Sequence, residues 1–376
     1  KIKKVYELAL KNGAPVIGIF DSKGGDIKEG MKTLGAYGEI AKMSAALSGA
    51  VPQIAVVDGL CAGTAAMIAC MADVVIMTEK SELFMTAPFT ADDKTAGAGT
   101  AENAAKSGVA AILAKDSDEA IAKAKQLLSV LPANNLETAG NDYYMENDAA
   151  VSADLKGIEL INSVADKESV IELYKQFGTS AVTAIGSLNW RTAGFVATNN
   201  GAKLTADDSA KIARFVTLCD AYSIPVVTFV DSEGFEKSSA ELAGSIRDSA
   251  KLAQAYASAT TAKIAVVTGK AYGSAYVALA STAAGSDFTF AWEGAVIAPT
   301  TPEAAVVFLN GVSEDNAKQA QEYADNEADA FTAAANGYVD RVITAEDTKS
   351  ALTSAIEATS SKRVVTPAKK HVNFVY

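Results

Sequence analysis

The sequence predicts an α/β protein built from two related halves. The segment PVIGIFDS at 15–22 returns as PVVTFVDS at 225–232, and the segment at 54–64 returns at 264–274, both 210 residues later. Short apolar runs rich in β-branched residues alternate with segments of helical spacing, which is typical of parallel strands covered by helices. Because two separate matches share one offset, the repeat indicates duplicated domains.

The copies are expected to differ by small insertions only. A weaker third similarity, between residues 86–88 and 297–299, has an offset of 211. Each copy should therefore run in the same order: strand, loop, helix, strand, helix.

The first half contains most of the predicted elements. They are a helix over 1–10, strands over 16–20, 54–57 and 74–77, helices over 30–47 and 64–71, a loop with a weak helix over 91–106, and a helix over 117–131. The strand runs are continuously apolar, as expected of strands buried on both faces. Helical spacing over 30–47 predicts a buried stripe made of Met31, Leu34, Ile40, Met43 and Leu47. Ser117 is the expected N-cap of its helix.

A polar, turn-rich stretch from Pro132 to Asp154 is the expected linker. It divides the chain into an N-terminal domain over 1–150 and a C-terminal domain over 151–376. A hairpin over 182–198, with its turn at 189–191, is expected at the start of the second domain. The repeat then predicts a strand from Val226, a helix over 242–257, a strand from Ile264 and a helix after Gly273. The chain opens on an amphipathic stretch without an initiator Met or an N-cap, so we expect upstream sequence before Lys1.

The composition narrows the possible chemistry. The chain has 33 Lys and Arg against 45 Asp and Glu, a net charge of −12, which argues against nucleic-acid binding. No apolar run reaches the roughly 18 residues of a membrane span. Three cysteines without a CxxC pair indicate a reducing, cytoplasmic compartment, with neither a disulfide framework nor a zinc site. The single histidine, His371, lies near the end of the chain, which argues against a histidine-based triad and a histidine metal cluster.

Two glycine turns are the main candidate sites. The runs LCAGTA at 60–65 and KAYGSA at 270–275 each follow a predicted strand and open a predicted helix. Such a turn presents backbone amides that stabilise a developing oxyanion. A second donor is expected from the loops KGG at 23–25 and EGF at 233–235. A glycine turn can also serve only close packing of helix on sheet, but its recurrence at one offset favours a functional role.

These turns belong to a longer set of motifs that resembles the carboxyltransferase subunits of biotin-dependent acyl-CoA carboxylases and decarboxylases, typified by the propionyl-CoA carboxylase β subunit. The resemblance covers nearly the whole chain. The family's motifs APVIGLxDSGGARIQEG, VPQISxxxGPCAGG, YLPSNN, IPLVTFVD, KAYGGAY and RKHGN have counterparts here at 15–30, 51–64, 131–135, 224–231, 270–276 and 369–373.

The resemblance implies two tandem crotonase-like domains and a histidine-free mechanism. In that family one backbone oxyanion hole holds the thioester enolate of an acyl-CoA, and the other holds the ureido oxygen of biotin. By position, the acyl-CoA hole here comprises Ala62, Gly63 and Thr64 with Gly24 and Gly25. The biotin side comprises Tyr272, Gly273, Ser274, Ala275 and Val277 with Gly234 and Phe235.

The resemblance also implies partners. Biotin is carried on a biotin carboxyl carrier protein, and the other partner is a biotin carboxylase or a membrane decarboxylase subunit. The family's site forms between the two chains of a homodimer, usually within a hexamer. Family members carry about a hundred further residues upstream.

Several positions depart from the family pattern. Thr64 and Ser274 replace the second glycine of each turn, which keeps the backbone donors but adds side chains. Asp26 stands where the family has Arg, and Glu233 lies where the family has a proline. Val277 replaces the acidic residue of propionyl-type members, so a strictly propionyl-selective enzyme is not expected.

Two other functions are consistent with the sequence. A serine peptidase of related fold would use Ser274 as its nucleophile and would need Lys270 or Lys23 as its base. A divergent structural subunit with little activity is the second alternative, because both turns and their loops are altered.

Overall fold

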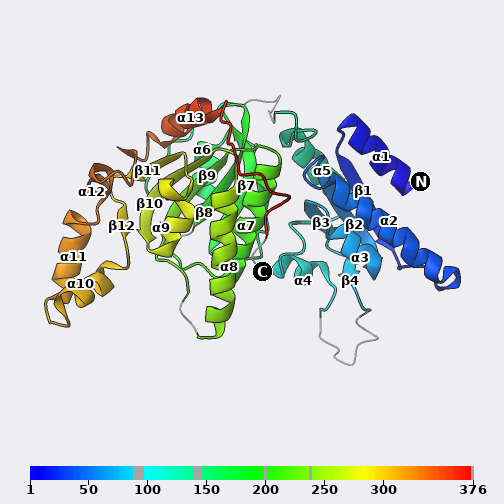
Figure 1. Ribbon diagram of the computed structural model, residues 1–376, viewed down its shortest axis with the longest axis horizontal. Coiled ribbons are helices and arrows are strands. Elements are labelled where there is room, and N and C mark those ends of the chain that lie inside the picture. The colour runs from blue at the N-terminus through cyan, green and yellow to red at the C-terminus, as the bar shows by residue number, and fades with distance from the viewer. Residues whose placement is uncertain (88–96, 139–144, 199–200, 237–238, 374–376) are drawn as a thin grey trace. The chain divides into compact units, whose positions relative to one another are not determined.

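The computed structural model describes residues 1–87, 97–138, 145–198, 201–236 and 239–373 (Figure 1). The chain packs as two units. The first contains Lys1–Asp142 and Leu173–Phe177, and the second contains Tyr143–Glu172 and Gly178–Tyr376. Among the described residues, no helix has the length and apolar character needed to cross a bilayer.

The first unit is a parallel five-stranded sheet with helices packed on it. Its sheet has the order β1-β2-β3-β5, and β4 pairs with β2 beyond the reach of β3. Its elements are α1 (Ile2–Asn12), β1 (Val16–Ser22), η1 (Ile27–Glu29), α2 (Met31–Leu47), β2 (Gln53–Ala62), α3 (Thr64–Ala69), β3 (Val74–Thr78), β4 (Glu82–Phe84), α4 (Ala101–Lys106), β5 (Ile112–Ala114) and α5 (Ser117–Val130).

The second unit has an eight-stranded sheet of order β13-β11-β10-β9-β8-β7-β6, with β12 paired to β10. Its elements are α6 (Gly157–Val164), β6 (Ile171–Leu173), β7 (Ala181–Leu188), β8 (Arg191–Thr198), α7 (Ala206–Ala221), β9 (Val226–Ser232), α8 (Ser239–Ser258), β10 (Lys263–Tyr272), α9 (Ser274–Leu279), η3 (Thr282–Ala284), β11 (Phe288–Trp292), β12 (Val296–Ala298), α10 (Pro302–Asn310), α11 (Asn316–Asn326), α12 (Ala330–Ala335), β13 (Arg341–Ile343) and α13 (Thr348–Thr359). The α/β class predicted from the sequence is confirmed.

The two sheets repeat the same pairing with the offset found in the sequence. Val16 pairs with Gln53 in β1–β2, and Val226 pairs with Lys263 in β9–β10, so both partners are shifted by 210 residues. The match predicted between residues 86–88 and 297–299 is wrong in its alignment. Ala62 pairs with Phe84 and Tyr272 pairs with Ala298, which makes the offset of these short strands 214 rather than 211. Pro88, the last residue of that match, lies outside the described residues.

The predicted hairpin is confirmed, with β7 and β8 paired antiparallel from Ala181–Thr198 to Leu188–Arg191. Its turn residues, Asn189 and Trp190, have φ of 50° and 62°. Two consecutive positive φ values are the signature of the turn whose twist matches that of the strands it joins.

The buried stripe predicted on α2 is correct for its last three residues and wrong for its first two. Leu47 is buried, and Ile40 and Met43 pack against the small core formed by α1 and β1. Met31 and Leu34, however, are 84% and 64% exposed. Helical spacing identifies an apolar face but not the element that covers it, and no described residue covers the first turns of α2.

Strand β1 also differs from the prediction of burial on both faces. Its side chains alternate between buried or half-buried and exposed, and Ile17 and Ile19 are exposed. The reason is its position at the end of the sheet order, because β1 pairs only with β2 among the described strands. Its counterpart β9 lies between β8 and β10 and is buried throughout.

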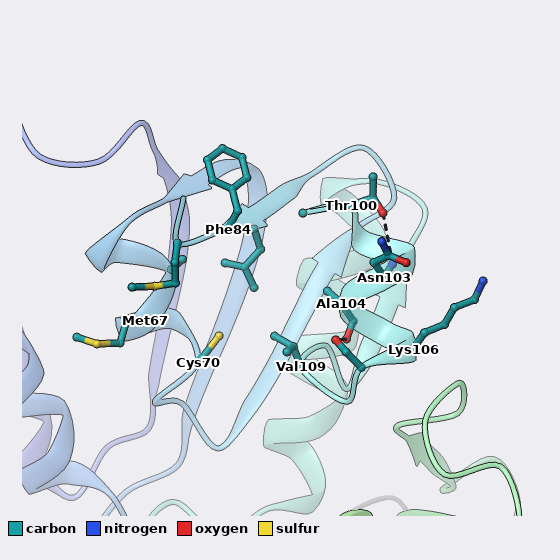
Figure 2. A pocket seen from close by; sticks show the side chains of 13 residues that line it. Met67, Cys70, Phe84, Thr100, Asn103, Ala104, Lys106 and Val109 are labelled. Atoms are coloured by element: carbon teal, nitrogen blue, oxygen red, sulfur yellow. Dashed lines mark hydrogen bonds between the residues drawn. The ribbon is translucent and has the colours of Figure 1, made fainter. Parts of the chain in front are cut away.

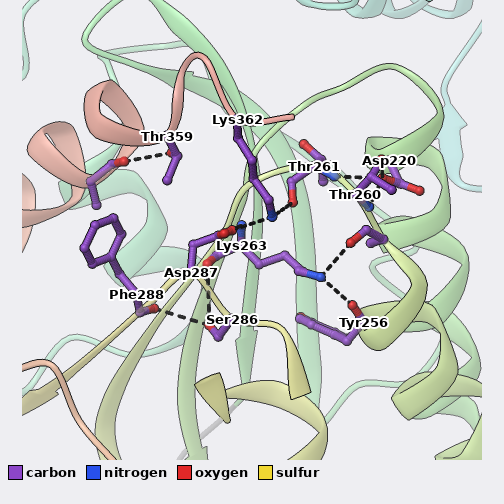
Figure 3. A network of polar contacts seen from close by, with 12 residues as sticks. Asp220, Tyr256, Thr260, Thr261, Lys263, Ser286, Asp287, Phe288, Thr359 and Lys362 are labelled. Carbon is purple, nitrogen blue, oxygen red and sulfur yellow. Dashed lines mark hydrogen bonds and ion pairs between the residues drawn. The ribbon is translucent and has the colours of Figure 1, made fainter. Parts of the chain in front are cut away.

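A polar network fixes the start of β10 in the second unit (Figure 3). Lys263 Nζ donates to the carbonyl oxygens of Tyr256 and Ala259 at 2.6 and 2.7 Å, which caps the end of α8. Lys362 Nζ pairs with Asp287 Oδ2 at 2.8 Å, and the same oxygen accepts from the Lys263 backbone amide at 2.8 Å. Burial lowers the pKa of Lys263. The network holds one end of the strand whose other end carries Gly273.

Candidate functional site

Both glycine turns lie where a strand ends and a short helix begins. Thr64 is the first residue of α3 after β2, and Ser274 is the first residue of α9 after β10. The predicted helix starts at these two residues are therefore confirmed. The glycines before them have nearly the same backbone angles, with φ/ψ of 64°/−136° at Gly63 and 54°/−127° at Gly273. Such a conformation favours glycine because other residues meet a steric cost there.

Each turn is fixed by its own amide, which leaves the next two amides available. The Gly63 amide donates to the Phe84 carbonyl at 2.9 Å, and the Gly273 amide donates to the Ala298 carbonyl at 2.9 Å. No described residue accepts a hydrogen bond from the backbone amides that follow, which are those of Thr64, Ala65, Ser274 and Ala275. Ala65 was not among the predicted residues, although the 210-residue repeat of Ala275 points to it.

The two loops pass over the turns in the same way. Gly24 and Gly234 have φ of 99° and 111°, and a Cβ at each would lie 3.7 and 3.9 Å from the carbonyl oxygens of Ala62 and Tyr272. Their amides are already engaged, because they donate to Ser22 Oγ at 3.3 Å and Ser232 Oγ at 3.2 Å. The free loop donors are the next amides along the chain.

Those next amides belong to Gly25 and Phe235, which donate to no described residue. The predicted loops are therefore in place, with the available donor one residue later than the glycines of positive φ. A side chain at position 25 would be crowded, since a Cβ there would lie 2.3 Å from Thr33 Cγ2. Asp26 caps η1 by accepting from the Lys28 amide at 2.9 Å, so this departure from the family pattern has a local structural role.

The side chains around the second turn differ in exposure. Tyr272 is buried against Ala298 and Ala328, and Phe235 is half-buried. Ser274 and Val277 are exposed on α9, three residues apart and so on the same side of the helix. The residues predicted to bind biotin thus gather at one end of β10.

An ion pair beside the second turn favours the charged form of Lys270. Its Nζ lies 2.7 Å from Glu233 Oε1, and its backbone amide donates to Asp231 Oδ1 at 2.9 Å. The hydrogen bond that Lys270 donates to Glu233 raises the pKa of Lys270. A general base must be neutral, so a lysine held in its charged form is unsuited to activate Ser274 as a peptidase nucleophile. Leu60 occupies the equivalent position in the first unit. Because its side chain is uncharged, the first unit cannot form this ion pair.

A pocket of about 670 Å³ opens beside α3 in the first unit (Figure 2). Figure 2 shows Met67 and Cys70 of α3 across the pocket from Asn103 and Lys106 of α4. The lining residues are Ala66, Met67, Cys70, Leu83, Phe84, Met85, Gly99, Thr100, Asn103, Ala104, Lys106, Ser107 and Val109. Sequence reasoning missed this pocket because its walls come from α3, β4 and α4, and no motif joins them.

Comparison with known proteins gives a consistent result. The chain matches the family described as carboxyl transferase domain over residues 1–374. It is 36% identical to the methylmalonyl-CoA carboxyltransferase 12S subunit of Propionibacterium freudenreichii subsp. shermanii, covering 100% of this chain and 77% of that protein. It is 34% identical to the propionyl-CoA carboxylase beta chain of Roseobacter denitrificans (99% and 79% covered). It is 35% identical to the methylmalonyl-CoA decarboxylase subunit alpha of Veillonella parvula (99% and 78% covered).

A solved structure extends the similarity to three dimensions. The transcarboxylase 12S crystal structure, a hexamer with methylmalonyl-coenzyme A and methylmalonic acid bound, matches with a TM-score of 0.93 at 35% identity. The match covers 100% of this chain and 78% of that one.

Proposed function

This chain belongs to the carboxyl transferase family, and from that premise we propose how its two turns divide one reaction. It is a subunit of a biotin-dependent enzyme that transfers a carboxyl group between carboxybiotin and an acyl-CoA. The observation that carries the proposal is the repetition of the glycine turn. Each copy follows the end of a strand and presents amides that have no described acceptor. A reaction with two halves needs two such oxyanion sites.

The first turn serves the acyl-CoA half. Transfer of a carboxyl group at the carbon next to a thioester places negative charge on the thioester oxygen. The amides of Thr64 and Ala65 in the turn, and of Gly25 in the loop, are the donors for that oxygen. Gly63, Gly24 and Ala62 shape the backbone that presents them. Because the donors are backbone groups, Thr64 performs this role as well as glycine.

The second turn serves the biotin half. Biotin, carried on a partner, supplies the carboxyl group as carboxybiotin. The amides of Ser274, Ala275 and Phe235 are the donors for the ureido oxygen. Gly273 and Gly234 hold these amides in position, while the side chains of Tyr272 and Val277 form the walls of the site. The residues present fit the group because these three amides donate to no described residue and can therefore donate to an oxygen.

The assembly follows from this division of the reaction. The acyl-CoA half is assigned to residues 1–150 and the biotin half to 151–376. We infer a homodimer, within a hexamer like that of the transcarboxylase 12S structure, that works with a biotin carboxyl carrier protein in the cytoplasm. The third component is a biotin carboxylase in one direction of the reaction, or a membrane decarboxylase subunit in the other.

Two substitutions at Ser274 test the role of its backbone amide. Decarboxylation of methylmalonyl-CoA is measured with free biotin as acceptor. Ser274→Gly should retain activity because the amide remains, whereas Ser274→Pro should lose about 10²–10³ in rate because one donor is gone. Proline is well tolerated at the first position of a helix, so the variant is expected to fold. Ser117→Pro, the same change at the first position of α5, is the matched control.

Each alternative predicts a different result. A peptidase would be inactivated by Ser274→Gly, because the nucleophilic hydroxyl is removed. A structural subunit would show no carboxyl transfer in any version. Equal activity of Ser274→Pro and Ser117→Pro would contradict the assigned role of the Ser274 amide.

A further inference from the structure

We propose that the pocket beside α3 receives the alkyl chain of the acyl group, and that the substrates include acyl-CoA thioesters with chains of about four to eight carbons. This inference rests on the proposed function, because the thioester must lie at the first turn. It adds the class of substrate, which the two turns do not determine.

The pocket begins where the first turn ends. Met67 lies three residues after Thr64 on α3, which places its side chain about one helical turn, or roughly 5 Å, along the same face. Phe84, which lines the pocket, accepts the hydrogen bond from Gly63 through its carbonyl at 2.9 Å. An acyl group whose carbonyl oxygen binds the Thr64 and Ala65 amides therefore has the pocket beside it.

The walls are apolar and adaptable. Apolar side chains come from α3, from β4 with the residue after it, and from the segment after α4; they are Met67, Leu83, Phe84, Met85 and Val109. Methionine is unbranched and flexible, so it adjusts to ligands of different length. Such walls favour alkyl groups over polar ones.

The polar side chains of Thr100, Asn103, Lys106 and Ser107 on the rim each already have a partner within the protein. Thr100 Oγ1 donates to the Gly97 carbonyl at 2.7 Å, and Asn103 Nδ2 donates to the same oxygen. Ser107 Oγ donates to the Ala104 carbonyl at 3.3 Å. Lys106 Nζ is paired with Glu102 Oε1 at 2.6 Å, which also lowers the pKa of Glu102. Among the described lining residues the one cation, Lys106, is paired with Glu102, which argues against a site built for the phosphates of coenzyme A or for a second carboxylate on the acyl chain.

The size of the pocket also points to chains longer than propionyl. At about 670 Å³ the pocket is larger than the methyl of a propionyl group needs, so it has room for several further carbons. A six-carbon chain would place several methylene groups against these apolar walls, and their removal from water favours binding.

The experiment compares short and long substrates at one chemical step. Decarboxylation with free biotin is followed for methylmalonyl-CoA and for butylmalonyl-CoA, in the wild type and in Met67→Trp. Met67 is exposed on the side away from the core, so tryptophan fills the pocket without overpacking the interior. Met31→Trp is the matched control, because Met31 is an exposed methionine on α2 outside the pocket.

The wild type should process both substrates, with kcat/KM for butylmalonyl-CoA at least equal to that for methylmalonyl-CoA. Met67→Trp should lower kcat/KM for butylmalonyl-CoA at least tenfold, mainly through KM, and change the value for methylmalonyl-CoA less than threefold. Met31→Trp should leave both unchanged.

A wild type that uses methylmalonyl-CoA but not butylmalonyl-CoA would overturn the inference and leave the proposed function intact. Equal losses for both substrates in Met67→Trp would overturn it as well. Hexanoyl-CoA, which cannot react by decarboxylation, provides a binding readout, and its inhibition constant should rise in Met67→Trp only. Absence of turnover with every acyl-CoA would refute the proposed function and, with it, this inference.

Discussion

Lys211 places an ammonium group in the interior of the second unit. The side chain, on α7, is 2% exposed, and Nζ donates to the carbonyl oxygens of Ala181 at 2.7 Å and Gly178 at 3.3 Å. Burial lowers the pKa of Lys211 to about 8, against the opposing attraction of Asp208 and Glu172. Two carbonyl partners accept from two of the three ammonium donors but do not neutralise the charge, so this residue costs stability while it is protonated.

The consequence is a pH-dependent stability that rises with pH, as it does for ion-paired carboxylates, but in an alkaline window. Between the native pKa of about 8 and the ordinary value of 10.5, the unfolded chain holds a proton that the native chain has lost. Stability therefore rises with pH across this window. Relative to Lys211→Met, the wild type should gain about 2 kcal/mol in free energy of unfolding between pH 8 and pH 10.

Urea unfolding at several pH values measures this difference. Lys318→Met, at an exposed position on α11, should show no such gain and serves as the control. Parallel pH profiles for the wild type and Lys211→Met would mean that Lys211 titrates normally.

At the scale of the element, the N-terminus of α5 shows which of two adjacent residues caps the helix. Asp116, not Ser117, is the N-cap: its Oδ1 accepts from the Glu119 amide at 3.0 Å, and Glu119 Oε2 accepts from the Lys115 amide at 2.8 Å. Asp116→Ala should cost about 1 kcal/mol in free energy of unfolding. Ser117→Ala, one residue along, should change it by less than about 0.5 kcal/mol. Urea midpoints measure both, and a larger cost for Ser117→Ala would contradict the cap seen here.

Elements that carry their own local signal could be predicted from the sequence. The two turns and their flanking strands were found because glycine is required where φ is positive, and because buried strands are apolar in any context. Asp and Ser are equally good N-caps, so their adjacency left the start of α5 open by one residue. Met31 and Leu34 were misjudged, and the α3 pocket was missed, because both depend on which distant elements are neighbours. That information lies in packing rather than in any local pattern.

At the scale of the whole molecule, α10 presents an apolar surface. Phe308 and Leu309 near its end, and Val312 just after it, are exposed, Phe308 to 86%. Large apolar side chains exposed on one short segment of a subunit are expected to lie in an interface. Phe308→Asp should therefore shift the protein toward monomers and lower carboxyl transfer at the same protein concentration, because the proposed site combines turns from two chains.

Light scattering at micromolar concentration measures the mass of the particle. Val365→Asp is the control, since Val365 is 97% exposed near the end of the chain and lies outside this surface. An unchanged mass for Phe308→Asp would place the interface elsewhere.

The difference between β1 and β9 has a practical consequence for handling this chain. Strand β9 is shielded by β8, whereas the outer edge of β1 has no described partner strand. A strand edge of this kind recruits any extended peptide through main-chain hydrogen bonds, with little regard for its side chains. We therefore expect this edge to support self-association at high concentration, separate from any assembly through α10. Phe308→Asp on α10 should leave that association intact, whereas a short peptide able to add a strand to β1 should abolish it.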